Sequence, residues 1–244
     1  MNQLVRMNAE TYAQHWGAES MRFEQRGLYA DLAKITPKQR LLEIGSGNGL
    51  ATTHLALDRK VLGLDNNPFL LGVAKENNSN NPNAEFMETD VFNLSPDQIQ
   101  KVTGFSPQGI VAWMVGSDPD TVDSRVSGDI RMQERPKLYR EAVEDLIVLE
   151  PICTASVNWI HMAHRIGVDS QATDHKIHEE VVKDYESHML LNSDFRVARV
   201  DILEWKREPN DFMYVSAANN FKASSVRNCI LSIIATRGQR GEKA

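Results

Sequence analysis

Two patterns of apolar and polar positions alternate along the chain. Short apolar runs bounded by turn-forming residues are separated by longer stretches in which apolar residues recur at helical spacing. Strands are predicted at 41–44, 61–64, 85–88, 110–115, 156–162, 197–205 and 229–235. Helices are predicted at 19–34, 50–57, 68–77, 95–102, 136–148 and 175–190. This alternation predicts an α/β fold, a mostly parallel sheet with helices on both faces.

Capping and turn-forming residues support several of these boundaries. Asn67-Pro68 supplies an N-cap residue and a first-turn proline for the helix at 68–77. The stretch 116–135 has no clear period, and loops of that length in compact domains are usually functional or disordered, so it is a candidate substrate loop. No repeat or flexible linker divides the chain. We therefore predict one domain over 1–244, with an N-terminal helical lid at 1–38 and a core at 39–240.

Composition and charge narrow the function classes. The 244 residues carry 27 Lys+Arg and 33 Asp+Glu, a net charge of −6, and only two cysteines, Cys153 and Cys229, which we expect to be buried free thiols. No apolar run is long enough for a signal peptide or a membrane span, so a soluble, cytoplasmic protein is expected. Residues 221–244 carry +4 and residues 1–220 carry −10. This balance argues against nucleic acid as a partner.

The segment 41–51 carries the most information about chemistry. An apolar strand, Leu41-Leu42-Glu43-Ile44, runs into glycines at 45, 47 and 49 and then into a helix. Such a turn lets the backbone approach a ligand at a helix N-terminus. The dinucleotide fingerprint that begins at Gly45 needs glycine or alanine at position 50, where this chain has Leu50. A phosphate-binding loop with its lysine is absent from the sequence as well.

This segment resembles motif I of the class I S-adenosylmethionine-dependent methyltransferases. Val61-Leu62-Gly63-Leu64-Asp65 resembles the family's second strand, Glu88-Thr89-Asp90-Val91 the end of the third, and Ile110-Val111-Ala112-Trp113-Met114 the fourth. The resemblance implies a Rossmann-like seven-stranded sheet with its last strand antiparallel, and S-adenosyl-L-methionine as cofactor. It implies that Asp65 takes the ribose hydroxyls, to which a carboxylate is suited because it accepts two hydrogen bonds.

The same resemblance implies roles for residues at the ends of the third and fourth strands. Asp90 would meet the adenine amino group and Val91 would pack on the ring, while Trp113 and Met114 would lie beside the methionine part. The implied cofactor-binding residues are Glu43, Gly45, Ser46, Gly47, Asn48, Gly49, Asp65, Asn66, Asp90, Val91, Trp113 and Met114. Solvated strand-end carboxylates and core packing are the alternative interpretations. After the fourth strand the match loosens, because Leu149-Glu150-Pro151-Ile152-Cys153 lacks the family's glycines and 210–222 would be an insertion.

Candidates for the acceptor side are sparse. Tyr12 and Trp16 lie on one side of a helix turn and could contact substrate or pack a lid helix on the core. Asp118 could bind a cationic group or merely shape a turn. Methyl transfer needs a base only when the nucleophile must lose a proton, so His161, Tyr12 and His15 are weak catalytic candidates. His161 and His164 face opposite sides of their strand. No metal site is predicted.

The leading hypothesis is therefore an S-adenosylmethionine-dependent methyltransferase that acts by in-line displacement on a small-molecule acceptor. Residues 116–135 carry −2 and 171–190 carry −3, which favours a neutral or cationic acceptor. The alternatives are a non-catalytic cofactor-binding or accessory protein and a methyltransferase acting on protein or RNA. A nicotinamide dehydrogenase is disfavoured by Leu50. The acceptor's identity and the oligomeric state are left open.

Overall fold

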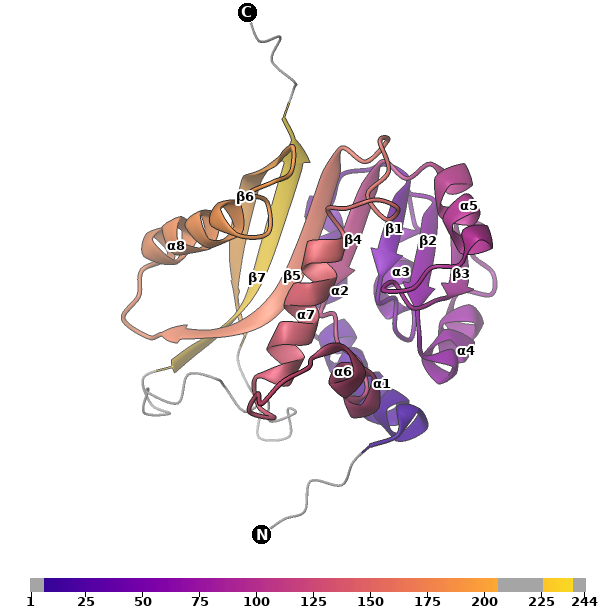
Figure 1. Cartoon of the computed structure of the whole chain (residues 1–244), viewed down its shortest axis with the longest axis horizontal. Coiled ribbons are helices and arrows are strands. Elements are labelled where there is room, and N and C mark those ends of the chain that lie inside the picture. Colours follow the sequence, from indigo (N-terminus) through magenta and orange to yellow (C-terminus); the bar gives the residue numbers. More distant parts are fainter. Residues whose placement is uncertain (1–6, 206–225, 239–244) are drawn as a thin grey trace, which may run out of the picture.

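One seven-stranded sheet organises the molecule in the computed structural model, which describes residues 7–205 and 226–238 (Figure 1). Its strands run in the order β3-β2-β1-β4-β5-β7-β6. The bounds are β1 (Leu41–Ile44), β2 (Val61–Asp65), β3 (Ala84–Glu88), β4 (Gly109–Trp113), β5 (Trp159–Asp169), β6 (Phe195–Glu204) and β7 (Val226–Arg237). Strands β1 to β5 are parallel, and β7 is antiparallel to both β5 and β6. The predicted fold class is confirmed.

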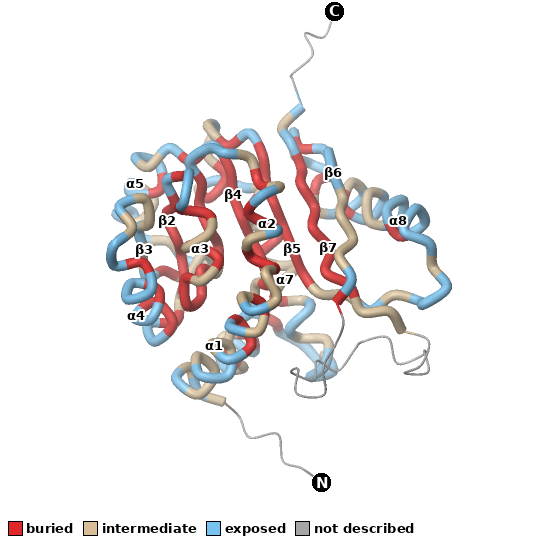
Figure 2. The backbone as a smooth tube through the Cα atoms, turned by 180° about the vertical axis from the view of Figure 1, so that it is seen from behind, coloured by how far each residue is buried: buried red, intermediate tan, exposed pale blue. Residues whose placement is uncertain are grey.

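Helices cover both faces of this sheet. On one face lie α1 (Ala9–Gln25), α2 (Leu28–Ile35), α3 (Leu50–Leu55) and α4 (Pro68–Asn77) (Figure 2). On the other lie α5 (Pro96–Phe105), α6 (Pro119–Arg125), α7 (Arg135–Leu146) and α8 (Asp174–Ser187) (Figure 1). Two apolar cores follow, one on each face, and β1, β2 and β4 are buried along their whole length between them. A parallel sheet covered on both faces requires such continuous apolar strands.

Some helix boundaries match the sequence and others do not. Helix α4 spans the predicted residues, and the Asn67 side chain accepts hydrogen bonds from the amides of Phe69 and Leu70. The single helix predicted at 19–34 is instead two helices. They are separated at Gly27, whose φ of 72° lies in the left-handed region. The first of them also begins ten residues earlier than predicted, at Ala9.

Other differences concern the fourth and fifth strands and the stretch after the fourth. The predicted strand 110–115 ends at Trp113, because Met114 takes a positive φ of 53°. Strand β5 begins at Trp159 and continues to Asp169, because β7 pairs with it along that whole length. The stretch 116–135, which has no clear period, contains α6. The insertion predicted at 210–222 lies outside the described residues.

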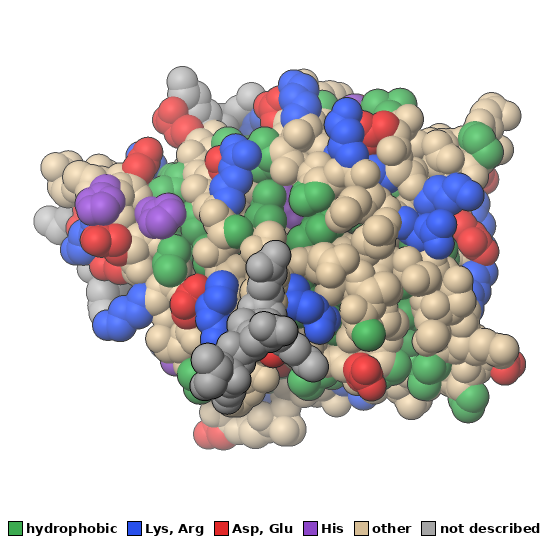
Figure 3. All heavy atoms as spheres, turned by 90° about the horizontal axis from the view of Figure 1, so that it is seen from above, with side chains coloured by type: hydrophobic (Ala, Val, Ile, Leu, Met, Phe, Trp, Pro, Cys, Tyr) green, Lys and Arg blue, Asp and Glu red, His purple; other side chains and the backbone are tan. Residues whose placement is uncertain are grey.

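Three further observations bear on the expectations from composition. Cys153 and Cys229 are free and buried, as expected. Among the helices of residues 7–205 and 226–238, none combines the length and apolar character that crossing a bilayer requires. Lys and Arg side chains are interspersed with Asp and Glu on the molecular face seen in Figure 3, which is the side away from α1 and α6.

Candidate functional site

A tight turn follows β1 at the edge of the sheet where the parallel strands end. Gly45, Gly47 and Gly49 all have positive φ, at 71°, 55° and 75°. The amides of Gly45 and Ser46 both donate to the carbonyl of Leu64, at 2.8 and 3.1 Å. A Cβ at Gly49 would stand 2.9 Å from Ala74, so this glycine permits the close approach of α3 to α4. The glycines therefore hold the chain in a path that other residues adopt only at a cost.

Asp65, the last residue of β2, joins this turn to the next one. One carboxylate oxygen, Oδ2, accepts the amide of Gly47 at 2.8 Å, and Oδ1 accepts the amide of Asn67 at 2.9 Å. The side chain is buried, and burial raises its pKa to about 6 against the opposing effect of hydrogen bonds from the amides of Asn67, Gly47 and Asn66. The carboxylate thus lies at the edge of the sheet with acceptor capacity left over.

A pocket that is partly open to solvent lies beside Asp65. It is formed where β1, β2, β3 and β4 end, the expected ligand position in an open α/β sheet. Five predicted cofactor residues line it: Gly45, Asp65, Asn66, Asp90 and Val91. Thr89 lines it too, and its buried hydroxyl has no hydrogen-bond partner among the described residues. An unpaired buried hydroxyl is costly, so the pocket offers a polar group that a ligand could satisfy.

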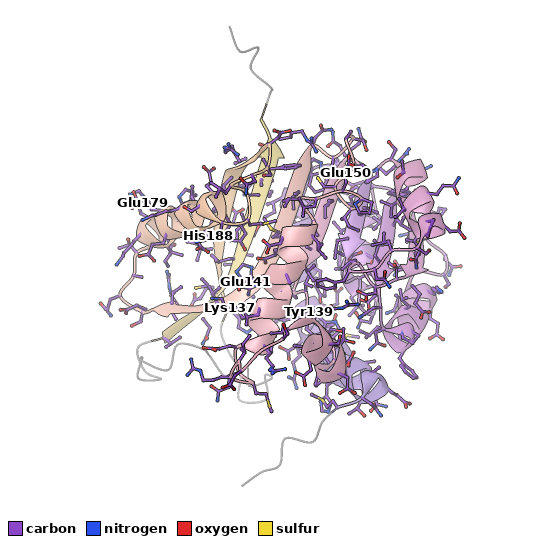
Figure 4. All side chains as sticks on the ribbon, viewed as in Figure 1. Lys137, Tyr139, Glu141, Glu150, Glu179 and His188 are labelled. Carbon is purple, nitrogen blue, oxygen red and sulfur yellow. The ribbon has the colours of Figure 1, made fainter. Side chains whose placement is uncertain are left out.

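Helix α7 supplies a wall of the pocket that the sequence analysis missed. Tyr139 and Val143, four residues apart, both line it. Figure 4 shows Tyr139 on the side of α7 that faces the β1–β2 half of the sheet, opposite Lys137 and Glu141. Burial raises the pKa of Tyr139 to about 12, opposed by a hydrogen bond with Ser117. The sequence shows that these two residues share one face of a helix, but it does not show which element that face contacts.

Other predicted cofactor residues support the turn without lining the pocket. Glu43 is buried and accepts the Thr52 hydroxyl at 2.5 Å, and burial raises its pKa to about 8. The side-chain oxygen of Asn48 accepts the hydroxyl of Ser20 of α1 at 2.9 Å. Ser46 is also buried, and its hydroxyl has no partner within the described part of the chain.

Trp113 and Met114 also lie away from the pocket lining. Both are buried in the core on the α1–α3 face. The Trp113 ring lies 5.1 Å from that of His161, edge to face. The structure thus places these two residues behind the site, with Val115 and Gly116 reaching the pocket in their stead.

The N-terminal helix lies across the glycine turn. A Cβ added at Gly47 would stand 2.8 Å from Nε1 of Trp16, and one at Gly116 would stand 3.3 Å from the Tyr12 hydroxyl. Tyr12 and Trp16 are therefore both beside the site, whereas His15 on the same helix is exposed. The side-chain amide of Asn67 also donates to the carbonyl of Ala9 at 2.9 Å.

Asp118 has a local task in the structure. Its Oδ1 accepts the amides of Asp120 and Thr121, and its Oδ2 accepts the Thr121 hydroxyl at 2.7 Å. It is the N-cap residue of α6. These bonds occupy most of its acceptor capacity, so its geometry is that of a helix cap.

His161 lies in the core. It is fully buried, with Nδ1 2.8 Å from the Thr36 hydroxyl and Nε2 2.9 Å from the Ser232 hydroxyl. Burial lowers its pKa to about 3, so the ring is neutral. His164 faces the opposite side of β5, where its ring lies near Glu144 and Tyr185. His161 is not among the pocket-lining residues, because the strand directs it toward α2.

Comparison with known proteins finds only neighbours that share the fold. No protein-family model matches the sequence, and no curated protein matches it significantly. The complex between the Haloferax volcanii Trm112 methyltransferase activator and the putative methyltransferase aligns with 12% identity and a TM-score of 0.51, over 96% of this chain and 100% of that one. The 23S rRNA methyltransferase ErmE aligns with 18% identity and a TM-score of 0.46, over 88% and 68%.

A third neighbour is the magnesium protoporphyrin IX methyltransferase from Synechocystis PCC 6803 with bound S-adenosylmethionine. It has 14% identity and a TM-score of 0.47, over 95% of this chain and 85% of that one. Two further neighbours, EvdMO1 and P. horikoshii TYW2, are longer chains, of which this chain spans 41% and 62%.

These neighbours correct one prediction. The acidic balance of the chain predicts that nucleic acid is not a partner. That prediction is wrong, because its neighbours include an rRNA methyltransferase and a complex with an activator protein. Net charge describes the whole chain, whereas a partner meets one face of it, so the balance excludes neither class.

The strand order, the glycine turn and the structural neighbours all indicate the same fold. The sheet has seven strands and its last strand, β7, is antiparallel to β5, as the resemblance in the first four strands implied. Residues far apart in sequence meet around the carboxyl ends of β1 to β4. The chain therefore has the fold of the class I S-adenosylmethionine-dependent methyltransferases.

Proposed function

We propose that this protein is an S-adenosylmethionine-dependent methyltransferase that uses the pocket beside Asp65. The observation that carries the proposal is the buried Asp65 carboxylate, which spans the amides of Gly47 and Asn67 at the edge of a glycine turn. A carboxylate fixed in this way accepts two hydroxyl groups of a ribose without reorganising. The same geometry serves poorly for a nicotinamide dinucleotide, since Leu50 stands where the fingerprint requires a small residue.

The residues around the pocket fit such a cofactor. Asp65 would take the ribose hydroxyls and Asp90 the adenine amino group, with Val91 against the base. The unpaired Thr89 hydroxyl would gain a partner. The methionine part would extend toward Gly45 and the turn over which Trp16 lies. Each of these groups is already positioned by backbone hydrogen bonds or packing, which limits the entropy lost on binding.

The protein's part in the reaction is positioning and exclusion of water. The cofactor supplies a methyl group on a sulfonium, which an in-line nucleophile takes without further activation if it carries a free lone pair. Helix α1 covers the turn with Trp16, and the Tyr12 hydroxyl lies beside Gly116. Tyr12 is the polar side chain of α1 best placed to contact an acceptor. His161 would stabilise the core and not serve as a base, because both of its ring nitrogens are hydrogen-bonded to buried hydroxyls.

For the acceptor we propose a neutral or cationic small molecule. Asp65 and Asp90 line the pocket, and Asp118 lies close enough to influence Tyr139. Of the cations nearby, Arg125 is already paired with Asp90. An electrostatic environment of this sign favours a cation over an anion. Transfer assays with labelled cofactor against amine libraries, total RNA and a protein extract test this directly, and label in the RNA or protein fraction alone would reject it.

Calorimetry tests the site itself. We expect the wild-type chain to bind S-adenosylhomocysteine with micromolar affinity, and Asp65→Ala and Gly47→Val to lose it. Valine at position 47 would need a φ of 55° and would collide with Trp16. Asp97→Ala, an exposed aspartate in the first turn of α5, is the matched control and should bind as wild type. Unchanged affinity in both site variants would reject the assignment.

A second candidate is a protein that binds the cofactor without transferring its methyl group. It is favoured by one observation: the two ring nitrogens of His161 are occupied, so that the most promising candidate base has no access to an acceptor. Turnover of S-adenosylmethionine to S-adenosylhomocysteine with any acceptor excludes this candidate.

A further inference from the structure

We propose that Arg125 clamps α6 over the adenine end of the pocket and so slows release of the cofactor. The proposal rests on the proposed function, because it concerns the same pocket. It adds a role for a residue to which the comparison of motifs assigns none. Arg125 is the last residue of α6, in the segment whose function the sequence left open.

The contacts of Arg125 lie along the rim of the pocket. Its guanidinium pairs with Oδ2 of Asp90 and lies 5.1 Å from the centre of the Phe92 ring. On its other side Phe92 lies 5.6 Å from the ring of Tyr139, which lines the pocket. The Arg125 guanidinium, the Phe92 ring and the Tyr139 ring therefore follow one another along the rim of the pocket. They come from α6, from the loop after β3 and from α7.

Contacts hold helix α6 in place at both ends, and Arg125 makes one of them. At its start Asp118 is buried and caps the helix through Asp120 and Thr121. In the middle, Asp123 accepts from Arg135 of α7 at 2.7 Å. At the far end, Val126 is buried in the core and the Arg125–Asp90 pair joins the helix to the loop after β3. Breaking the pair would loosen the end of α6 on the adenine side, while the N-cap and the buried Val126 stay in place.

The pair is compatible with a bound purine. A carboxylate has about four lone-pair positions, of which the Arg125 guanidinium and the amide of Phe92 use two. An amino group donating from inside the pocket can use another. The Arg125 and Asp90 side chains are 33% and 30% exposed, so the pair stands at the rim and not on the floor. Arg125 would thus cover the outer side of a bound adenine without displacing it.

Because the pair is partly exposed, its expected effect is modest and sensitive to salt. We expect Arg125→Ala to release S-adenosylhomocysteine about two- to fivefold faster than wild type at low salt, a factor set by the usual strength of such pairs. High salt should shrink the difference. Arg125→Lys, which keeps the charge but not the planar fork, should restore part of it. A loss of general stability would move neither the salt dependence nor the rescue.

The experiment uses the full chain and stopped-flow release of S-adenosylhomocysteine, with hydrogen exchange of residues 117–127 in the ligand-free protein. Arg131→Ala is the matched control, because Arg131 lies in the same segment and pairs with the partly exposed Glu134 instead. We expect faster exchange of 117–127 in Arg125→Ala and wild-type behaviour in Arg131→Ala. In an Asp90→Asn background, Arg125→Ala should add little to the exchange rate.

The outcomes separate the two proposals. If wild type binds no S-adenosylhomocysteine, the proposed function fails and the clamp with it. If wild type binds and Arg125→Ala releases at the same rate, the clamp alone is rejected. Tighter binding by Arg125→Ala also rejects it, since that result would make Arg125 a competitor of the purine for Asp90.

Discussion

The indole of Trp16 lies against the backbone of Gly47: a Cβ at that glycine would stand 2.8 Å from Trp16 Nε1. Gly47 also holds a φ of 55° and donates its amide to Asp65. One residue thus joins the turn, the carboxylate and the N-terminal helix. Its lack of a side chain is required by two independent constraints, the backbone conformation and the contact with α1.

Gly47→Ala separates these constraints. We expect the left-handed backbone to cost about 1–2 kcal/mol of unfolding free energy, with a further penalty from the contact with Trp16. In a Trp16→Ala background the contact penalty disappears and the backbone penalty remains. Urea unfolding of wild type, both single variants and the double variant measures the coupling, which we expect at about 0.5–1 kcal/mol. Strict additivity would show that Trp16 does not meet the turn.

Binding of S-adenosylhomocysteine should depend on pH through Asp65. Burial raises the pKa of this carboxyl to about 6, and only its ionised form accepts two ribose hydroxyls while holding both backbone amides. Affinity should therefore be steady above about pH 7 and fall as pH drops through 6, approaching tenfold per pH unit below it. Calorimetry between pH 4.5 and 8 measures this. An Asp65→Asn variant should bind weakly with a flat profile, and a flat wild-type profile would contradict the prediction.

Glu144 of α7 should make stability depend on pH. Burial raises its pKa from 4.5 to about 7, and Arg140, 3.3 Å away, only partly opposes this. Between these values the folded chain holds a proton that the unfolded chain has released, so the unfolding free energy falls as pH rises through this window. Glu144→Gln removes that effect.

The difference between Glu144→Gln and wild type should grow by up to about 3 kcal/mol from pH 4.5 to 7 in favour of the variant. Thermal or urea unfolding across that range measures it. Glu141→Gln, in the same helix and paired with Lys137 at the surface, should show no such trend. A constant difference for Glu144→Gln would mean that this carboxyl ionises normally in the folded protein.

The two candidate histidines should behave oppositely. His161→Ala leaves a cavity, removes the partner of the Ser232 hydroxyl and leaves the Thr36 hydroxyl only its bond to the carbonyl of Leu32, so we expect a loss of about 2–4 kcal/mol in unfolding free energy. His15→Ala removes an exposed side chain and should change it by less than about 0.5 kcal/mol. Chemical denaturation compares them. A His161→Ala variant as stable as wild type would reject the core role assigned here.

Local sequence determined the architecture and the heart of the candidate site. Strand β1 and helix α4 have the predicted bounds, because each is marked by nearby signals: an apolar run before glycines, and Asn67-Pro68. The position of Asp65 beside the turn also followed from sequence. Parallel strands end at one edge of the sheet, so a residue at the end of β2 must lie next to the loop after β1.

Tertiary structure alone decided which side chains complete the pocket. Tyr139 reaches it because α7 crosses the sheet with that face inward, and Trp113 misses it because its position in β4 directs its side chain into the core on the α1–α3 face. Arg125 meets Asp90 across 35 residues of sequence. Periodicity records which positions share a face of one element. It does not record which other element that face will meet, since that depends on how whole helices pack on the sheet.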